Sequence, residues 1–502
     1  MLRNVGSNWI LTIVAAGATY ALTPFIIHAL GREGYGVWTL ITALTGYISL
    51  LALGVPMACV RYLAQHIAER DVRQINSAIG SCAGLYLMMS AAAVVLGTLL
   101  TGLFLAAYDI PAGLQRDAWV ALLIMVVQSA AAFIGFLPEG IMFAHHDFVM
   151  RNLVRISGVL LRLSLTIALL MLEASLIVLA LVQMVCLAFD VVVSWLLIRR
   201  RYTNIRIHLS DFDWAMVRRI FSFSIYALLL NAGVRLTFET DALVIGAALG
   251  VGLIPFYTVA NSLVVYLMDL VIAIAAVVAP MATKLGTEGN WDELREIFLK
   301  WSKVALSVSM MAGLFLIVLG PRFIAWWIDP SFERPSGQVL QIIMASSLLF
   351  LPVRGVALPI LMGLGNPRTP TFVFLATGLM NLGLSFALAR PLGLVGVALG
   401  TAIPNVLFAF VVLVLACRQL NVTVSSYLNY VVPRAALGAM PVAALLLWFK
   451  VGLDVHTIAG LIAAGSAMIV LFGLLWVFFV YRNDPYVDIR MHLDRFRVWS
   501  RA

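Results

Sequence analysis

Long apolar stretches of about 20 residues recur along the whole chain, with short polar segments between them. A helix of that length crosses the hydrocarbon core of a bilayer, whereas a membrane-barrel strand is a short alternating segment. Turn residues punctuate the stretches, as at 31–36 and 390–393. The pattern predicts an all-α polytopic membrane protein with about fourteen spans: 8–30, 37–60, 79–105, 117–142, 152–172, 174–198, 219–246, 254–282, 302–320, 338–363, 370–389, 392–417, 434–450 and 457–480.

The composition agrees with a bilayer environment, because 63% of the 502 residues are hydrophobic and 11% are charged. A soluble globular protein is about 45–50% apolar and about 25% charged. The first apolar stretch continues to Leu30 and further spans follow, so we expect an uncleaved first span. The four cysteines lie in or beside apolar stretches and form no CxxC pair, which predicts small packing residues without a disulfide framework or zinc site.

The net charge of +9 is unevenly distributed along the chain. With the N-terminus in the cytoplasm, roughly four times as many Lys and Arg residues fall in cytoplasmic as in outer segments. This positive-inside pattern predicts two cytoplasmic termini, and it explains the basic charge without a nucleic acid partner. The connections 199–218 and 283–301 mix charges with Trp and predict amphipathic surface helices, and the basic tail 481–502 predicts contact with anionic lipid.

Two halves of the chain can be aligned. The turn at 29–35 matches that at 248–257, and Pro138 matches Pro359, at an offset of about 220 residues that a parallel repeat would preserve. Six spans separate the copies, which predicts two six-helix lobes related by a pseudo-two-fold axis, with substrate between them. The predicted domains are an N-terminal lobe (1–200), a cytoplasmic linker (201–218), a C-terminal lobe (219–418), helices 13 and 14 (419–480) and the tail (481–502). Helices 13 and 14 form either a lipid-facing groove or a peripheral addition.

Three arginines lie well inside predicted spans, away from their ends: Arg162, Arg235 and Arg354. At 1.5 Å per residue, Arg354 lies in the cytoplasmic half, Arg162 near the midplane and Arg235 in the outer half. Because guanidinium groups bind phosphate bidentately, three that face a central cavity would suit a phosphate or pyrophosphate substrate. The alternative is local pairing with acids or carbonyls, for which Arg235 and Glu239 have the i,i+4 spacing.

Four acids are candidates to bind a coupling proton or sodium ion: Glu239, Asp241, Asp269 and Asp190. Asp241 is placed near the outer surface, so a solvated helix end is the favoured interpretation there. Asp190 and Asp269 are interpreted as buried acids in spans six and eight, where a coupling site and a packing pair are equally favoured. No further cofactor and no metal site is predicted.

Pro352 and Pro359 flank Arg354 in the tenth predicted span. Proline removes a backbone donor and kinks a helix, so this region is predicted to be either a hinge or a static kink. Catalytic signals are missing: no lysine follows a glycine in a phosphate-binding loop, and there is no HExxH motif and no long outer loop. These features point away from an enzyme.

Several short motifs carry a family resemblance: Leu30-Gly31-x3-Tyr35-Gly36, Leu53-Gly54 and Arg61-Tyr62 near the N-terminus, Asp241 with Ile245-Gly246, Leu249-Gly250 and Tyr257 in the second half, and Gly363-x-Gly365-Asn366-Pro367 after span ten. With them, most of the chain resembles the polysaccharide-biosynthesis flippases of the multidrug/oligosaccharidyl-lipid/polysaccharide exporter superfamily. The motifs are short and apolar, so they identify the family better than its substrate.

The resemblance implies a flippase in the bacterial cytoplasmic (inner) membrane. It would move an undecaprenyl-pyrophosphate-linked oligosaccharide, such as an O-antigen, capsule or exopolysaccharide unit, to the outer leaflet by alternating access. Membrane lipids, and a glycan polymerase or glycosyltransferase, are the partners it suggests. Alternatives are a lipid-linked peptidoglycan precursor flippase with the same fourteen-span plan, or a drug/cation antiporter with an acidic cavity. A membrane glycosyltransferase, polymerase or ligase would carry a large outer loop.

Overall fold

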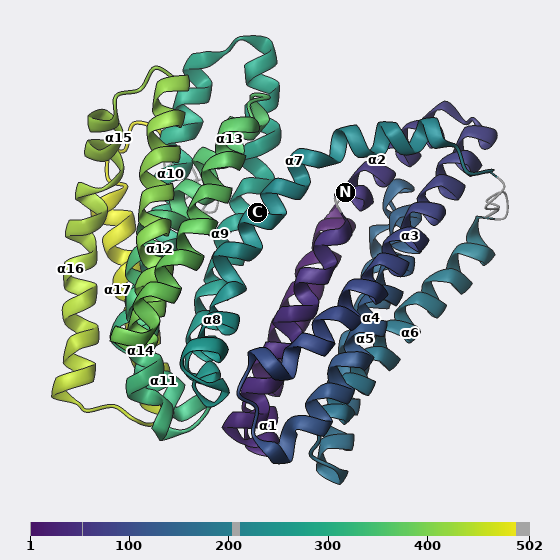
Figure 1. Ribbon diagram of the computed structural model, residues 1–502. Coiled ribbons are helices and arrows are strands. Elements are labelled where there is room, and N and C mark those ends of the chain that lie inside the picture. The colour runs from purple at the N-terminus through teal and green to yellow at the C-terminus, as the bar shows by residue number, and fades with distance from the viewer. Residues whose placement is uncertain (1, 53, 203–210, 488–502) are drawn as a thin grey trace, which may run out of the picture. The chain divides into compact units, whose positions relative to one another are not determined.

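The computed structural model describes residues 2–52, 54–202 and 211–487 (Figure 1). Every regular element in these ranges is helical, which confirms the predicted all-α class. Eleven helices among the described residues are long and apolar enough to cross a membrane. The chain is therefore a polytopic membrane protein, as its hydropathy pattern predicts.

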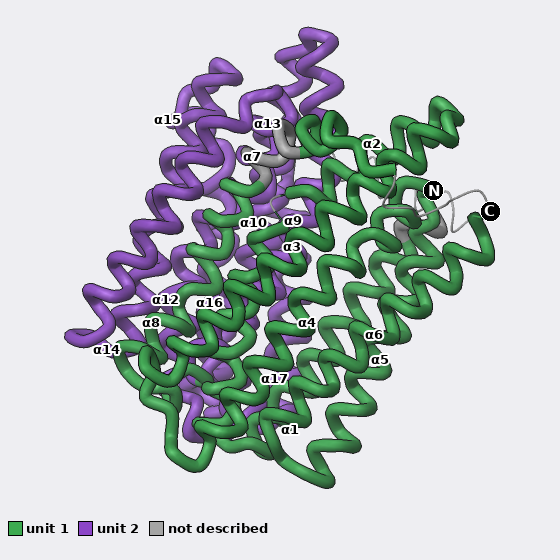
Figure 2. Tube along the Cα trace, turned by 45° about the vertical axis from the view of Figure 1, so that its right-hand side comes forward, with its two compact units in different colours: residues 1–255 green, residues 256–502 purple. Residues whose placement is uncertain are grey.

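The chain divides into two compact units, Met1–Pro255 and Phe256–Ala502 (Figure 2). This division falls after the predicted linker at 201–218. The reason is that α7 (Trp214–Phe238) packs on α2 and α3, and α8 (Thr240–Ala248) packs on α1, so both belong to the first unit. The assignment of two six-helix functional lobes stays a prediction.

The first unit begins with α1 (Leu2–Ile48), which is interrupted at Gly31. Gly31 has a φ of 70°, in the left-handed region that favours glycine. The 47 residues of α1 are about twice the number that one crossing of a bilayer core requires, and the break falls at the predicted turn between spans one and two. The remaining long helices of this unit are α2 (Val55–Glu69), α3 (Val72–Ala107), α4 (Ala112–Ala144), α5 (Phe148–Leu172) and α6 (Leu176–Arg201).

The second unit is built around α12 and α14, whose phenyl rings fill its interior. Phe408 lies against Phe350 and Phe374, with ring centroids 5.3 and 4.7 Å apart. α14 is interrupted at Gly393, again at a predicted turn. The helices are α9 (Ile254–Glu288), α10 (Trp291–Val318), α11 (Gly320–Trp327), α12 (Glu333–Pro352), α13 (Leu358–Gly363), α14 (Arg368–Gln419), α15 (Val424–Val431), α16 (Pro433–Leu447) and α17 (Ile458–Leu475).

The predicted elements and the observed helices differ in several places. α14 covers two predicted spans, whereas the predicted second span, 37–60, is divided between the end of α1, a short turn of 3-10 helix (Ser49–Ala52) and α2. The predicted seventh span, 219–246, is not one helix, because the chain breaks at Glu239 between α7 and α8. The predicted surface helix at 283–301 is wrong, since α9 and α10 extend through it to a turn at Asn290. Fourteen crossings stay a prediction. Parts of the predicted surface segments, 203–210 and 488–502, lie outside the described residues.

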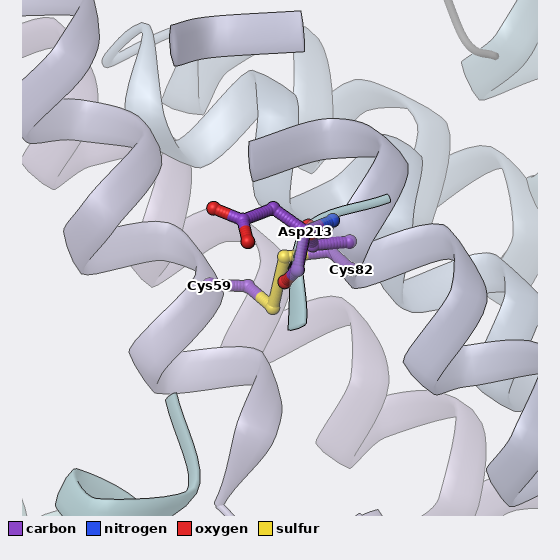
Figure 3. Close-up of a disulfide and its surroundings, with 4 residues drawn as sticks. Cys59, Cys82 and Asp213 are labelled. Carbon is purple, nitrogen blue, oxygen red and sulfur yellow. Dashed lines mark hydrogen bonds between the residues drawn. A yellow bond between two sulfur atoms is a disulfide. The ribbon is translucent and has the colours of Figure 1, made fainter. Parts of the chain in front are cut away.

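The prediction of unpaired cysteines is wrong for one pair. Cys59 on α2 and Cys82 on α3 form a disulfide across a helical hairpin, with Cα atoms 6.3 Å apart (Figure 3). Beside it, the backbone N–H of Asp213 donates to Ser81 Oγ at 2.9 Å, which fastens the start of α7 to α3. Cys186 and Cys417 are buried free thiols, as predicted.

Candidate functional site

Polar residues along α5 and α6 share helical spacing. Arg151, Arg155 and Arg162 follow one another at intervals of four and seven residues, which places them on one face of α5. On α6, Gln183 and Asp190 are likewise seven residues apart. These two faces, with α1 and α4, line a partly open cavity of about 420 Å³ in the first unit, here called the arginine cavity.

One end of the arginine cavity carries an ion pair. Arg155 donates from Nε to Oε1 and from Nη2 to Oε2 of Glu139 on α4, each at 2.8 Å. Both side chains are partly exposed, so the pair holds α4 and α5 together only weakly. It does neutralise one of the three arginines. The sequence pattern assigns Arg151 and Arg155 to a cytoplasmic connection, and only their spacing with Arg162 indicates a shared site.

Asp190 lies in the same cavity and is held close to α5. Its Oδ1 is buried and accepts no hydrogen bond from the described residues. Gly158 makes this placement possible, because a Cβ at position 158 would collide with that oxygen. Asp190 Oδ1 therefore faces α5 without receiving a hydrogen bond from that helix. Of the two alternatives for Asp190, a packing pair with a polar neighbour does not account for this oxygen.

Arg162 lies one turn beyond Gly158, half-buried at the far end of the arginine cavity. No hydrogen bond or ion pair joins its guanidinium to another described residue. Of the three arginines predicted within spans, Arg162 is the one that faces a cavity without a bonded partner in this part of the chain.

Arg235 follows the local-pairing alternative. Its Nη1 donates to Glu239 Oε2 at i,i+4, and its Nη2 donates to Ser49 Oγ at 2.7 Å. Gly46 leaves room for this pair, because a Cβ there would lie 2.8 Å from Nη1. Asp241, in the first turn of α8, is only 2% exposed, so the favoured interpretation of a solvated helix end is wrong.

Arg354 sits in a π-helical turn (Val353–Ala357) that joins α12 to α13 between Pro352 and Pro359. Its guanidinium carbon lies 5.0 Å from the ring centroid of Phe374. On α9, Asp269 is the acid whose charge acts on Arg354, but its side chain is exposed, so the prediction of a buried acid is wrong. Whether the turn is a hinge stays a prediction.

The second unit contains a buried charged cluster that the sequence does not predict. Lys303 on α10 is 1% exposed and pairs with Asp484, which follows the last helix. Tyr430 donates to Asp484 Oδ1 at 2.7 Å, and Lys303 Nζ lies 4.6 Å from the Tyr430 ring centroid. The sequence signal is a lysine at the second position of the predicted span 302–320.

Solved structures of known transporters share this fold. The chain is similar to the lipid II flippase MurJ in its inward closed conformation, with a TM-score of 0.69, 12% identity and coverage of 95% of this chain and 99% of that one. It is equally similar in TM-score, 0.69, to an inward-facing multidrug resistance MATE transporter of the MOP superfamily, at 16% identity and with 82% and 94% coverage. The fold therefore defines the class: a membrane protein with the MATE/MurJ architecture.

The sequence places the chain in a particular family. Residues 1–285 match the family described as "Polysaccharide biosynthesis protein", and the chain belongs to it. Two curated relatives are similar. The membrane protein EpsK of Bacillus subtilis (strain 168) is 23% identical over 427 residues, or 80% of each chain. A putative O-antigen transporter of Salmonella typhi is 22% identical over 323 residues, covering 63% of this chain and 71% of the relative. The predicted family resemblance is thereby confirmed.

Proposed function

We propose that this protein is a flippase that moves a polyprenyl-pyrophosphate-linked oligosaccharide from the cytoplasmic to the outer leaflet by alternating access. The family supports a role in polysaccharide biosynthesis, and the fold supports transport. The observation that carries the proposal is the arginine cavity of the first unit, which gathers three cations against two carboxylates. An excess of positive charge favours a phosphate-bearing substrate over a cationic drug.

The substrate contact is assigned first to Arg162. Because no described residue bonds its guanidinium, Arg162 can bind a phosphate oxygen pair without breaking an existing bond. Arg235 would have to exchange Glu239 for the substrate, and Arg354 would have to leave the face of Phe374. We keep Arg235 and Arg354 as contacts for a different stage of the transport cycle, when the helices around them move.

Coupling to a proton or sodium gradient is assigned to Asp190. A carboxylate oxygen that is buried and lacks a donor gains most from binding a cation. Glu239, Asp241 and Asp269 are secondary candidates, because Glu239 is already paired and Asp269 is exposed. Export driven by an imposed pH gradient, compared with a sodium gradient, identifies the ion, and the Asp190→Asn variant should abolish the dependence.

Depletion of the protein tests the function directly. We expect a polyprenyl-pyrophosphate-linked oligosaccharide to accumulate in the cytoplasmic leaflet, identified by mass spectrometry and by its protection from an impermeant periplasmic glycosidase. Accumulation of a lipid-linked peptidoglycan precursor would favour the alternative substrate. A normal outer-leaflet level of every lipid-linked glycan would contradict translocation.

The proposed setting is the bacterial inner membrane with both termini in the cytoplasm. Reporter fusions at the C-terminus that are active only in the cytoplasm, or only in the periplasm, test the orientation. Crosslinking in the membrane tests the proposed glycan polymerase or glycosyltransferase partners.

A further inference from the structure

A second cavity, of about 200 Å³, lies farther along the helices that form the arginine cavity. On α5, the arginine cavity is lined from Arg151 to Arg162, and the second cavity from Arg162 to Thr166. On α6, which contributes to both, Gln183 is likewise shared. The two cavities are therefore stacked end to end within the first unit, and Arg162 and Gln183 lie at the level where they meet.

The stacked cavities extend through much of a membrane's thickness. From Arg151 to Thr166, α5 advances roughly 22 Å at 1.5 Å per residue, against a hydrocarbon core of about 30 Å. The polar groups along this distance come from one compact unit. The side chains of Arg162 and Gln183 line both cavities and therefore lie where the two adjoin.

The second cavity is lined by hydroxyl groups and by no carboxylate. Several of these hydroxyls donate to carbonyls of their own helix, as Thr23 does to Thr19 at 2.8 Å and Thr39 to Tyr35 at 2.9 Å. Their oxygens are thus left as acceptors. The volume accommodates about six water molecules at 30 Å³ each. The threonines that line it are Thr19, Thr23, Thr39, Thr42 and Thr166.

Acceptor oxygens and water are a suitable medium for a cation. The charged groups facing the stacked cavities are Glu139 on α4, Asp190 on α6, and Arg151, Arg155 and Arg162 on α5, and α1 contributes none. The remaining titratable groups are Cys186 and Tyr35. All the carboxylates lie on the arginine-cavity side. A proton on Asp190 would find water and acceptors beyond Arg162 if that residue were neutral.

We propose that Arg162 is an electrostatic barrier that stops protons and sodium ions from passing between the arginine cavity and the hydroxyl-lined cavity. A guanidinium stays charged at every physiological pH, and a fixed arginine in a narrow polar path excludes cations. The barrier goes beyond the proposed function, because it acts in the absence of glycan. It explains how a polar path of this length can exist in a membrane without dissipating the ion gradient.

The test uses purified full-length protein in liposomes that contain a pH-sensitive dye and no glycan lipid. A proton gradient is imposed with potassium and valinomycin present to compensate charge. We expect Arg162→Gln to dissipate the gradient at least about tenfold faster than wild type. Arg162→Lys should restore the seal, and Arg116→Gln, which removes an exposed arginine on α4, should not leak.

A second variant tests the route. Adding Thr42→Val and Thr166→Val to Arg162→Gln removes two hydroxyls with little change of shape, and it should slow the leak. An Arg162→Gln protein that is folded by size-exclusion chromatography and does not leak would overturn the proposal, as would an equal leak in Arg116→Gln. A leak unaffected by the two valines would overturn the assigned route. Glycan export is measured in a separate assay. The leak measured in these liposomes can therefore be interpreted even if the protein is not a flippase.

Discussion

Two charged clusters, one in each unit, are arranged in opposite ways. In the first unit, Arg162 and Asp190 line a cavity, and neither Arg162 nor Asp190 Oδ1 is bonded to a described residue. In the second unit, Lys303 is locked to Asp484 and enclosed by tyrosine rings. Charge in an apolar helix therefore does not by itself identify a functional site. The decisive difference is whether the neighbouring helices supply a counter-charge or leave space.

The largest stability effect is expected in the second unit. Lys303→Ala leaves the Asp484 carboxylate buried without its cation, which should cost about 3–5 kcal/mol and lower the thermal midpoint of the protein in nanodiscs. The double variant Lys303→Ala/Asp484→Ala should recover part of the loss. If both variants melt at the wild-type temperature, the Lys303–Asp484 ion pair does not stabilise this unit.

The largest effect on export is expected in the first unit. Arg162→Ala should reduce glycan export by about tenfold or more, because a cation free to bind phosphate is removed, and protein abundance should be unchanged. Arg235→Ala should have a smaller effect, because Glu239 already neutralises that residue. Equal export by wild type and the Arg162 variant would remove the contrast between the units.

The Cys59–Cys82 disulfide is expected to stabilise the first unit. Reduction, or Cys59→Ser, should lower stability by about 2–4 kcal/mol, as for other natural crosslinks. The measurement is thermal unfolding with and without a membrane-permeant reductant, with Cys186→Ser as the control at a free buried thiol.

Gly158→Ala tests how tightly Asp190 is held. The added methyl group collides with the carboxylate, and such overpacking costs about 1–3 kcal/mol. Removing the clashing atoms in Gly158→Ala/Asp190→Ala should restore the thermal midpoint. A Gly158→Ala protein with unchanged stability would show that the Asp190 side chain can adopt another conformation.

The smallest effect at neutral pH concerns the titration of Asp484. Burial acts to raise the pKa of this carboxyl, but hydrogen bonds from Lys303, Tyr430 and the Tyr486 backbone hold the pKa below its ordinary value. The stability that the carboxylate contributes is therefore present above about pH 4 and is lost as the pH falls through the lowered pKa. Tyrosine fluorescence of the isolated protein should change only below that point, and Asp484→Asn should abolish the transition.

The apolar stretches predict the fold class, and the turn residues between them predict the breaks at Gly31 and Gly393. Both are local features of the sequence. Such features do not predict which way a side chain faces. Depth along a helix places Asp241 near the outer surface, and Asp269 is interpreted as a buried acid, but Asp241 is buried and Asp269 is exposed. Burial depends on rotation about the helix axis and on the neighbouring helices. The Cys59–Cys82 disulfide and the arginine cavity are not predicted by the sequence for the same reason: each is formed by contacts between separate helices.

The missing side chains of two glycines carry a practical consequence. Gly158 makes way for Asp190, and Gly46 makes way for the Arg235–Glu239 pair. At both positions an added methyl group would displace a charged side chain from the place it occupies. A growth screen of substitutions at these two glycines would therefore report how strongly the protein depends on the positions of those charges.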